Sequence, residues 1–355
     1  MSFQPLENVP LAPFTTLELG GPARYFAEPA TDQGLLSGLD FAASRSLPVL
    51  ILGGGSNLVV ADAGFPGLVL RPRMRGKRFL ADDRLLVAAG EPFDDVAAFA
   101  AAQGRRGLEC LSGIPGAMGA APVQNIGAYG QEVADTILEV RVLDRHSLEF
   151  STLSRPACDF GYRDSLFKRT PDRFVILDVT LHLEKGPPTP PRNEELRRAL
   201  PDGADAATIR EVVLGVRRGK GMVYDQTAPN YRTAGSFFVN PVVDGKQASW
   251  IVATALARGK ATTAEAVPRH LLPNGRVKIP AAWLIEASGL AKGYRQGAVG
   301  ISPHHALALV HHGGGTTAAL IALARELCQT VQLRFGVKLV PEPTFVGLAW
   351  NPDAG

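Results

Sequence analysis

The sequence predicts an α+β protein with more than one domain. Residues 47–52 form an apolar, β-like run that leads into a glycine triplet and further β-like runs. Residues 175–183 alternate between apolar and more polar side chains, which is typical of a half-buried strand, whereas 316–335 carries an apolar stripe of helical period. At 355 residues the chain is long enough for two or three domains.

The composition of the chain argues against several classes of protein. The chain is 46% hydrophobic and 20% charged, and its net charge of +3 is small for this length, which argues against a general nucleic-acid binder. No apolar run approaches the ~20 residues that cross a bilayer, and the first residues lack a secretory pattern. The three cysteines, Cys110, Cys158 and Cys328, are too scattered for a disulfide framework or a zinc site. We therefore expect a soluble protein of the cytoplasm, with no membrane or nucleic-acid partner.

Apolar periodicity and terminal residues predict the remaining elements. Strands are expected at 84–89 and near the C-terminus, beginning at 337. The predicted helices span 95–103, 208–218, 246–257, 281–288 and 316–335. Thr208 and Glu211 have the spacing of a capping box, and Gly336 stands where the last helix should end.

The first candidate binding element is the loop after the strand at 47–52. Glycines after a buried strand let backbone amides approach a phosphate and form an anion-binding nest. The dinucleotide fingerprint GxGxxG fails here, because Leu58 occupies the third glycine position and a strand follows instead of a helix. A pyrophosphate held between short strands is one interpretation, and a plain turn is the other. The loop comprises Gly53, Gly54, Gly55, Ser56 and Asn57.

The second candidate element is the loop at 112–130. It combines little charge with many small residues, and Gln124, Asn125 and Tyr129 offer polar contacts. Such a loop is suited to lie against a flat ligand, although an ordinary surface loop is the alternative. Its glycines are Gly113, Gly116, Gly119, Gly127 and Gly130.

Seven motifs, taken together, are specific. They are TLELGGPARYF (16–26), LGGGSNLV (52–59), SGIPG (112–116), QNIGAYG (124–130), YRDSLFK (162–168), AGSFFVNP (234–241) and PEPTFVG (341–347). In this order they resemble the UDP-N-acetylenolpyruvoylglucosamine reductase family, in the longer of its two classes. The resemblance implies an FAD-binding module of the vanillyl-alcohol-oxidase type and an α+β substrate-binding domain. It places the first FAD subdomain at 1–70, completed by 337–355, the second at 71–225, and the substrate domain at 226–336.

The resemblance also implies the reaction. NADPH would reduce a non-covalently bound FAD, and UDP-N-acetylglucosamine enolpyruvate would then be reduced to UDP-N-acetylmuramate by a monomeric enzyme. Arg163 would stabilise the enolate-like charge, Ser236 would protonate the α-carbon, and Glu342 would assist. Without the resemblance, these three residues would be interpreted as an ion-pair partner of Asp164, a turn serine and a solvated charge.

The binding residues follow from the same motifs. FAD contacts are expected from Gly53, Gly54, Gly55, Ser56, Asn57, Ser112, Gly113, Ile114, Pro115, Gly116, Gly119, Asn125, Gly127, Ala128 and Arg217. Substrate contacts are expected from Tyr129, Tyr162, Lys220, Asn240 and Lys278.

The chain departs from the family pattern at two places. The stretch 190–196 contains no tyrosine, although the longer class usually carries one there that folds over the substrate. Val239 stands where the family usually has lysine, which leaves Asn240, Lys220 and Lys278 to hold the diphosphate.

Two other functions are compatible with the residues. An oxidase on the same scaffold would often tether FAD to an N-terminal histidine, but the first histidine here is His146, and Ser236 would have no role. A non-catalytic nucleotide-binding protein is the second alternative. The basic run at 71–78 is interpreted as a solvated sheet edge. No metal site is expected at the histidine pairs 304–305 and 311–312, because adjacent side chains of a strand point to opposite faces.

Overall fold

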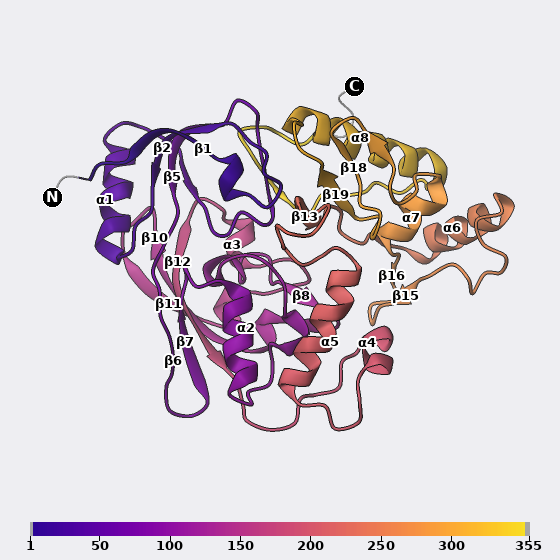
Figure 1. Cartoon of the computed structure of the whole chain (residues 1–355), viewed down its shortest axis with the longest axis horizontal. Coiled ribbons are helices and arrows are strands. Elements are labelled where there is room, and N and C mark those ends of the chain that lie inside the picture. Colours follow the sequence, from indigo (N-terminus) through magenta and orange to yellow (C-terminus); the bar gives the residue numbers. More distant parts are fainter. Residues whose placement is uncertain (1–2, 352–355) are drawn as a thin grey trace. The chain divides into compact units, whose positions relative to one another are not determined.

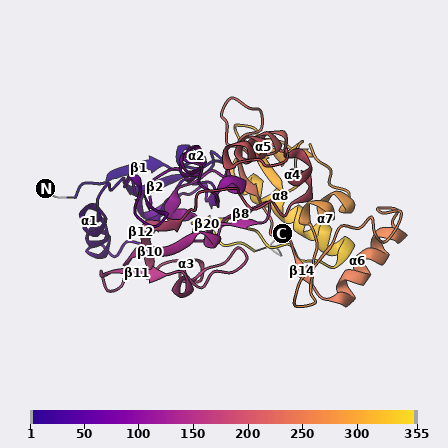
Figure 2. The same ribbon diagram turned by 90° about the horizontal axis from the view of Figure 1, so that it is seen from below.

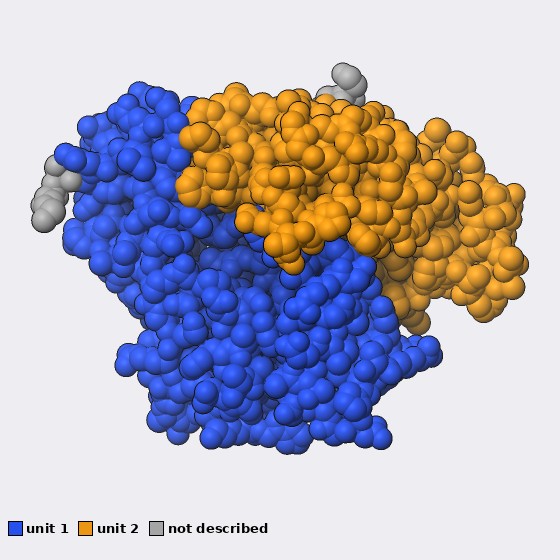
Figure 3. Space-filling view, in the orientation of Figure 1, with its two compact units in different colours: residues 1–9, 23–55, 65–224 blue, residues 10–22, 56–64, 225–355 orange. Residues whose placement is uncertain are grey.

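The computed structural model describes residues 3–351, and the chain divides into two compact units (Figure 3). Unit 1 contains the residues up to Val9 together with Ala23–Gly55 and Phe65–Tyr224. Unit 2 contains Pro10–Pro22, Ser56–Gly64 and the chain from Asp225 onward. Each unit therefore combines segments that are distant in the sequence.

The larger sheet of unit 1 is antiparallel and five-stranded. Its order is β11 (Phe150–Ser154), β10 (Ile137–Asp144), β12 (Phe174–His182), β7 (Arg84–Ala88) and β6 (Lys77–Phe79). The strands predicted at 84–89 and 175–183 are thus confirmed as strands. The second lies centrally in the sheet and is buried almost throughout, so its prediction as a half-buried strand is wrong. Strand β6 is an outer strand, so the end of the basic run at 71–78 lies at the expected sheet edge.

The second sheet of unit 1 carries the glycine triplet. Its order is β1 (Leu6–Pro10), β2 (Pro22–Ala27), β5 (Phe65–Leu70) and β3 (Val49–Ile51), and β2 and β3 both run parallel to β5. Helix α1 (Asp32–Ala43) packs on this sheet through a cluster that includes Leu35 and Leu68. A Cβ on Gly38 of α1 would lie 2.7 Å from the Leu70 side chain, so glycine allows this close packing. Helix α1 was not predicted from the sequence.

Helices α2 (Phe93–Ala102) and α5 (Ala206–Gly219) lie side by side in unit 1, and α4 (Glu194–Ala199) packs beside α5 (Figures 1 and 2). A single turn, α3 (Leu166–Arg169), follows the YRDS motif. The predicted capping box of α5 is wrong. The side chain of Asp205 accepts the amide of Thr208 at 2.8 Å, so the helix begins earlier and Thr208 lies in its first turn.

Unit 2 is a helical layer packed on a small antiparallel sheet. The sheet has the order β13 (Thr233–Ser236), β19 (Ala308–His311), β18 (Val299–Ile301) and β17 (Arg295–Gln296). The helices are α6 (Gly245–Ala257), α7 (Ala281–Ser288) and α8 (Thr317–Phe335), and all three predictions are confirmed. Leu284 of α7 and Leu327 of α8 are fully buried in one core, and Gly336 ends α8 with φ 65° as predicted.

Short strands complete both units. In unit 2, β14 (Val242–Val243), β16 (Val277–Lys278) and β15 (His270–Leu271) form a three-stranded sheet. There too, a C-terminal strand is present as β20 (Thr344–Val346), parallel to β4 (Leu58–Val60), but it begins seven residues after the predicted start at 337. In unit 1, β8 (Gly127–Ala128) pairs with β9 (Gln131–Glu132). Within residues 3–351, no helix is long and apolar enough to span a membrane.

Candidate active site

The two glycine-rich loops of unit 1 touch each other backbone to backbone. A Cβ on Gly54 would lie 2.5 Å from the Cα of Gly116, and a Cβ on Gly53 would lie 3.0 Å from the Cβ of Ala120. Gly55 has φ +63°, a left-handed conformation that glycine adopts without strain. The triplet is therefore more than a plain turn, because it allows two loops to approach as closely as their backbones permit.

The triplet also presents hydrogen-bond donors. Among residues 3–351, the backbone amides of Gly53, Gly54 and Gly55 donate to no acceptor. Successive undonated amides next to a left-handed residue are the pattern of an anion-binding nest. This donor set fits the pyrophosphate of a dinucleotide such as FAD.

The loop at 112–116 is anchored to the helices behind it. The amide of Gly113 donates to the Asp94 carboxylate at 2.6 Å, and two nitrogens of Arg210 donate to the same carboxylate at 2.5 and 2.9 Å. Burial raises the pKa of Asp94, but the hydrogen bonds from Arg210 and Gly113 outweigh it and leave the pKa below its usual value. The loop position thus depends on an ionised Asp94.

Arg217 connects this loop to the QNIGAYG segment. One of its terminal nitrogens donates to the carbonyls of Met222 at 2.7 Å and Gly113 at 3.3 Å, and burial lowers its pKa. Burial also raises the pKa of the neighbouring Tyr129. Within the described part of the chain, Nε of Arg217 and Oγ of Ser112 are buried without a hydrogen-bond partner. Since buried polar atoms are nearly always paired, these two suit the polar edge of a flavin ring.

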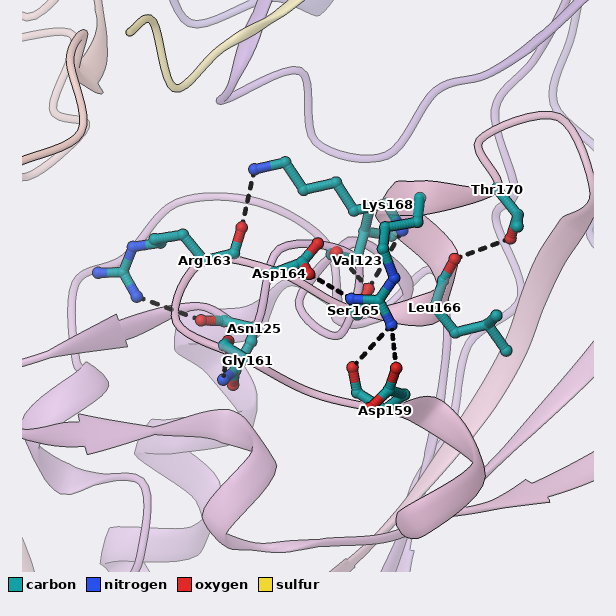
Figure 4. Close-up of polar contacts among 11 residues, drawn as sticks. Val123, Asn125, Asp159, Gly161, Arg163, Asp164, Ser165, Leu166, Lys168 and Thr170 are labelled. Atoms are coloured by element: carbon teal, nitrogen blue, oxygen red, sulfur yellow. Dashed lines mark hydrogen bonds and ion pairs between the residues drawn. The ribbon is translucent and has the colours of Figure 1, made fainter. Parts of the chain in front are cut away.

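Arg163 braces the QNIGAYG loop (Figure 4). Its guanidinium donates to the carbonyls of Asn125, at 3.2 Å, and Gly127, while its own carbonyl accepts Nζ of Lys168 at 2.8 Å. Its φ of 54° is strained for a side-chain-bearing residue. Asp164, the acid considered as its partner, forms an ion pair with Arg169.

Asn125 has a structural role that the sequence analysis missed. Its side chain donates to Glu132 at 2.7 Å and to the carbonyl of Gly161 at 2.9 Å, and it accepts the amide of Ala134 at 3.1 Å. With φ 44° and 1% exposure, Asn125 fixes the turn before Gly127. The amide side chain is thus used inside the protein, and the predicted FAD contact of Asn125 stays a prediction.

Two of the predicted catalytic residues lie on neighbouring segments of unit 2. Ser236 ends β13, after Gly235 with φ +73°. The amide of Glu342 donates to the carbonyl of Phe237 at 2.9 Å, and the carbonyl of Glu342 accepts Nδ2 of Asn57 at 3.3 Å. Among residues 3–351 the Ser236 hydroxyl forms no hydrogen bond, and it is half-buried. Sequence reasoning alone could not show that residues 236 and 342 are neighbours.

Phe237 and Phe238 are buried next to Ser236 and Glu342. Each is 1% exposed, and their rings meet edge to face with centroids 5.2 Å apart. Phe238 also forms an isolated antiparallel bridge with Pro341. The segments that carry Ser236 and Glu342 are therefore anchored in the apolar core of unit 2.

The predicted substrate residues form two groups. In unit 1, Nζ of Lys220 lies 5.8 Å from the ring centroid of Tyr129, and the guanidinium of Arg163 lies 5.4 Å from that of Tyr162. In unit 2, Asn240 and Lys278 belong to neighbouring strand segments. The side chain of Asn240 accepts the amide of Ala281 at 2.9 Å and thereby caps α7, a role that the sequence analysis did not predict.

The predicted FAD contacts are similarly distributed. Ser56 and Asn57 belong to unit 2, and the others belong to unit 1. Arg163 belongs to unit 1, whereas Ser236 and Glu342 belong to unit 2. The convergence of the three catalytic residues on one substrate stays a prediction.

Comparison with known proteins identifies the family. A family profile described as "UDP-N-acetylenolpyruvoylglucosamine reductase, C-terminal domain" matches residues 227–346, and an "FAD binding domain" profile matches 23–147. The UDP-N-acetylenolpyruvoylglucosamine reductase of Thermobifida fusca is 44% identical over 351 residues, which cover 96% of this chain and 98% of the relative. The enzyme of that name from Streptomyces coelicolor is 45% identical over 352 residues, covering 98% and 91%. The chain belongs to the UDP-N-acetylenolpyruvoylglucosamine reductase family.

A solved structure agrees with this assignment. The crystal structure of the UDP-N-acetylenolpyruvylglucosamine reductase from Thermus caldophilus is 27% identical, has a TM-score of 0.64, and covers 97% of this chain and 99% of its own. The predicted family, the α+β fold with an FAD-binding module and the class of flavin-dependent oxidoreductase are confirmed.

Proposed function

We propose that this protein uses FAD and NADPH to reduce UDP-N-acetylglucosamine enolpyruvate to UDP-N-acetylmuramate in peptidoglycan precursor synthesis. The observation that carries the proposal is the identity of 44–45% with reductases of this name over nearly the whole chain. The FAD binding domain match over 23–147 and the paired glycine loops support it.

The glycine loops, Ser112 and Arg217 would hold FAD, which supplies the hydride for the vinyl carbon of the substrate when it is bound. The amides of Gly53, Gly54 and Gly55 are suited to its pyrophosphate, and the buried Nε of Arg217 to its ring. We propose that FAD is bound non-covalently through these donors. The side chains of the protein supply the remaining requirements. These are a positive charge near the developing negative charge of the substrate, a proton donor and binding contacts for the diphosphate.

Arg163 is the proposed electrostatic partner. Addition of hydride to the vinyl carbon leaves negative charge on the α-carbon and the carboxylate, and a fixed guanidinium stabilises that charge more than it stabilises the substrate. The two carbonyls that Arg163 contacts, those of Asn125 and Gly127, hold the guanidinium in one orientation. Little reorganisation is then needed when the charge develops.

Ser236 is the proposed proton donor to the α-carbon, which completes the addition of a hydride and a proton across the double bond. A serine hydroxyl is a weak acid, so a neighbouring group must stabilise the alkoxide or return the proton. Glu342, on the adjoining segment, is the proposed assistant. The buried Phe237 and Phe238 would exclude water from the reacting carbon.

Tyr129, Tyr162, Lys220, Asn240 and Lys278 are the proposed substrate contacts. Because Asn240 caps α7, we assign it a positioning role, and the ammonium groups of Lys220 and Lys278 the attraction of the diphosphate. The proposed domains remain 1–70 with 337–355, 71–225 and 226–336. We also propose a monomer in the cytoplasm, which the three buried, free thiols suit because they require no oxidising compartment.

The test is an anaerobic pair of half-reactions. The purified holoenzyme is reduced with NADPH, UDP-N-acetylglucosamine enolpyruvate is added, and flavin absorbance is followed. We expect the oxidised spectrum to return only after addition of the enolpyruvyl substrate. If the flavin stays reduced after addition of the enolpyruvyl substrate, the proposal is wrong.

A further inference from the structure

The short helix α4 packs against α5. Leu196 of α4 is fully buried in a cluster with Ile209 and Val213 of α5. The side chain of Asn193 accepts the amide of Leu196 at 2.9 Å and begins the helix. Both contacts lie within unit 1, where α4 lies beside α5 (Figure 2).

A second residue of α4, an acid, pairs with the residue that follows α5. Oε2 of Glu195 lies 2.5 Å from Nζ of Lys220, the residue that follows α5. The same ammonium lies 5.8 Å from the centroid of the Tyr129 ring. Lys220 therefore contacts the Glu195 carboxylate and lies near the ring of Tyr129. Lys220 and Tyr129 are both proposed substrate contacts, whereas Glu195 is not.

A second contact fixes the same segment to the Tyr129 turn. A Cβ on Gly130 would lie 2.6 Å from the Cβ of Arg192, so the stem of Arg192 packs directly on that glycine. Gly130 has φ +90° and Tyr129 has φ 52°, which makes this a tight turn between β8 and β9. The segment 192–196 is thus held by two contacts, Arg192 on Gly130 and Leu196 on α5. These contacts place Glu195 next to Lys220.

We propose that Glu195 is a specificity-determining residue, an internal anion that the diphosphate of the ligand must displace from Lys220. This inference rests on the proposed function, because it takes Lys220 as a diphosphate contact. A ligand anion must replace Glu195 as the partner of Lys220. Its net gain in binding free energy is therefore the difference between its own attraction to Lys220 and the attraction of Glu195. A diphosphate, with more than one charge, can exceed it, whereas a single carboxylate on a small metabolite gains little.

Exposure makes the exchange feasible. The side chains of Glu195 and Lys220 are 57% and 30% exposed, so solvent screens the pair and a ligand can reach it. Exposed ion pairs shift an equilibrium by no more than about five-fold. Removal of the Glu195 charge should therefore tighten binding by about two- to five-fold, without a change in the chemical step.

The experiment compares Glu195→Gln with Glu194→Gln in the holoenzyme. Glu194 is adjacent and pairs with Arg198 on the surface, so it controls for loss of one negative charge on α4. We expect Glu195→Gln to lower KM for the enolpyruvyl substrate about two- to five-fold at unchanged kcat, and Glu194→Gln to match the wild type. In a Lys220→Met background the effect of Glu195→Gln should disappear, which a purely structural role of Glu195 would not produce.

A direct titration separates this inference from the proposed function. UDP is added to the oxidised holoenzyme, and its dissociation constant is read from the flavin spectrum. If the wild type binds UDP but its reduced flavin is not reoxidised by the enolpyruvyl substrate, the proposed function fails and the UDP titration still decides the role of Glu195. An unchanged or weaker affinity for UDP in Glu195→Gln overturns the inference, as does an equal gain in Glu194→Gln.

Discussion

The backbone amide of Glu342 donates a 2.9 Å hydrogen bond to the carbonyl oxygen of Phe237. This bond joins the segment after β13 to the C-terminal segment, more than a hundred residues later in the sequence. Pro341 and Pro343 disfavour helical backbone around Glu342, and Pro341 bridges to Phe238. The backbone segments that carry Glu342 and Ser236 are therefore joined directly within unit 2.

Glu342→Gln tests the charge of this residue without removing the backbone bond. We expect normal folding and normal flavin reduction by NADPH, with a rate of the second half-reaction lower by about 10²–10⁴-fold, the usual contribution of a positioned acid–base group. The measurement is stopped-flow absorbance of the flavin in each half-reaction. A variant that reoxidises as fast as the wild type would exclude Glu342 from the chemistry.

Gly54→Ala tests the contact of the two glycine loops. The added Cβ would lie 2.5 Å from the Cα of Gly116, so one loop must move, at a cost of about 1–3 kcal/mol. We expect less FAD per purified chain and a lower melting temperature. Gly215→Ala is the control, because nothing lies within 4 Å of its Cβ and alanine in a helix gains about 0.5–1 kcal/mol. Equal flavin content in both variants would contradict the role of the loops.

Asp94→Asn tests the anchor of the 112–116 loop. Because the folded-state pKa of Asp94 is lowered, its contribution to stability is complete above its unfolded pKa of about 3.9 and is lost as pH falls through the folded value. We expect Asp94→Asn to cost about 1–3 kcal/mol at neutral pH and to reduce the loss of stability below about pH 4. Chemical unfolding as a function of pH measures both effects.

The control for this prediction is Asp95→Asn. Asp95 is exposed and adjacent on α2, so its substitution should change the free energy of unfolding by less than about 0.5 kcal/mol. If the two variants unfold alike at every pH, Asp94 is not the anchor.

Arg163→Lys tests the fixed guanidinium. Lysine keeps the charge but cannot donate to the carbonyls of Asn125 and Gly127 with the same fork. We expect kcat/KM for the enolpyruvyl substrate to fall about 10²–10³-fold, with a much smaller effect on flavin reduction by NADPH. Arg169→Lys, at an exposed ion pair with Asp164, serves as control. An equal loss in both half-reactions would indicate a general structural defect instead.

Helices and strands were largely predictable where the spacing of apolar residues and the residues at the two ends indicate the same element. Helix α8 has both the stripe and the terminal Gly336, and its range was predicted to within one residue. Helix α1 was missed because Gly34 and Gly38 weaken the local helical signal, although Gly38 is required for packing on Leu70. The start of α5 was misplaced because Asp205 and Thr208 are both good capping residues, and only the backbone shows which one caps.

The site was predictable as a set of residues but not as an arrangement. Motifs identified Asn125, Asn240 and Arg163, whereas their partners are distant in sequence: Asn125 binds the carbonyl of Gly161, Asn240 caps α7, and Arg163 holds the carbonyl of Gly127. No local pattern encodes these contacts, because they depend on how loops pack. The Glu195–Lys220 pair was missed for the same reason.

The most direct test of the whole account is the Ser236→Ala variant in the two anaerobic half-reactions. Loss of one unbonded, half-buried hydroxyl should leave folding, FAD content and reduction by NADPH unchanged, as should the surface control Ser249→Ala on α6. The account predicts that Ser236→Ala stalls with reduced flavin after addition of the enolpyruvyl substrate, with a rate lower by about 10²–10⁴-fold. Reoxidation of the Ser236→Ala flavin at the wild-type rate would contradict it.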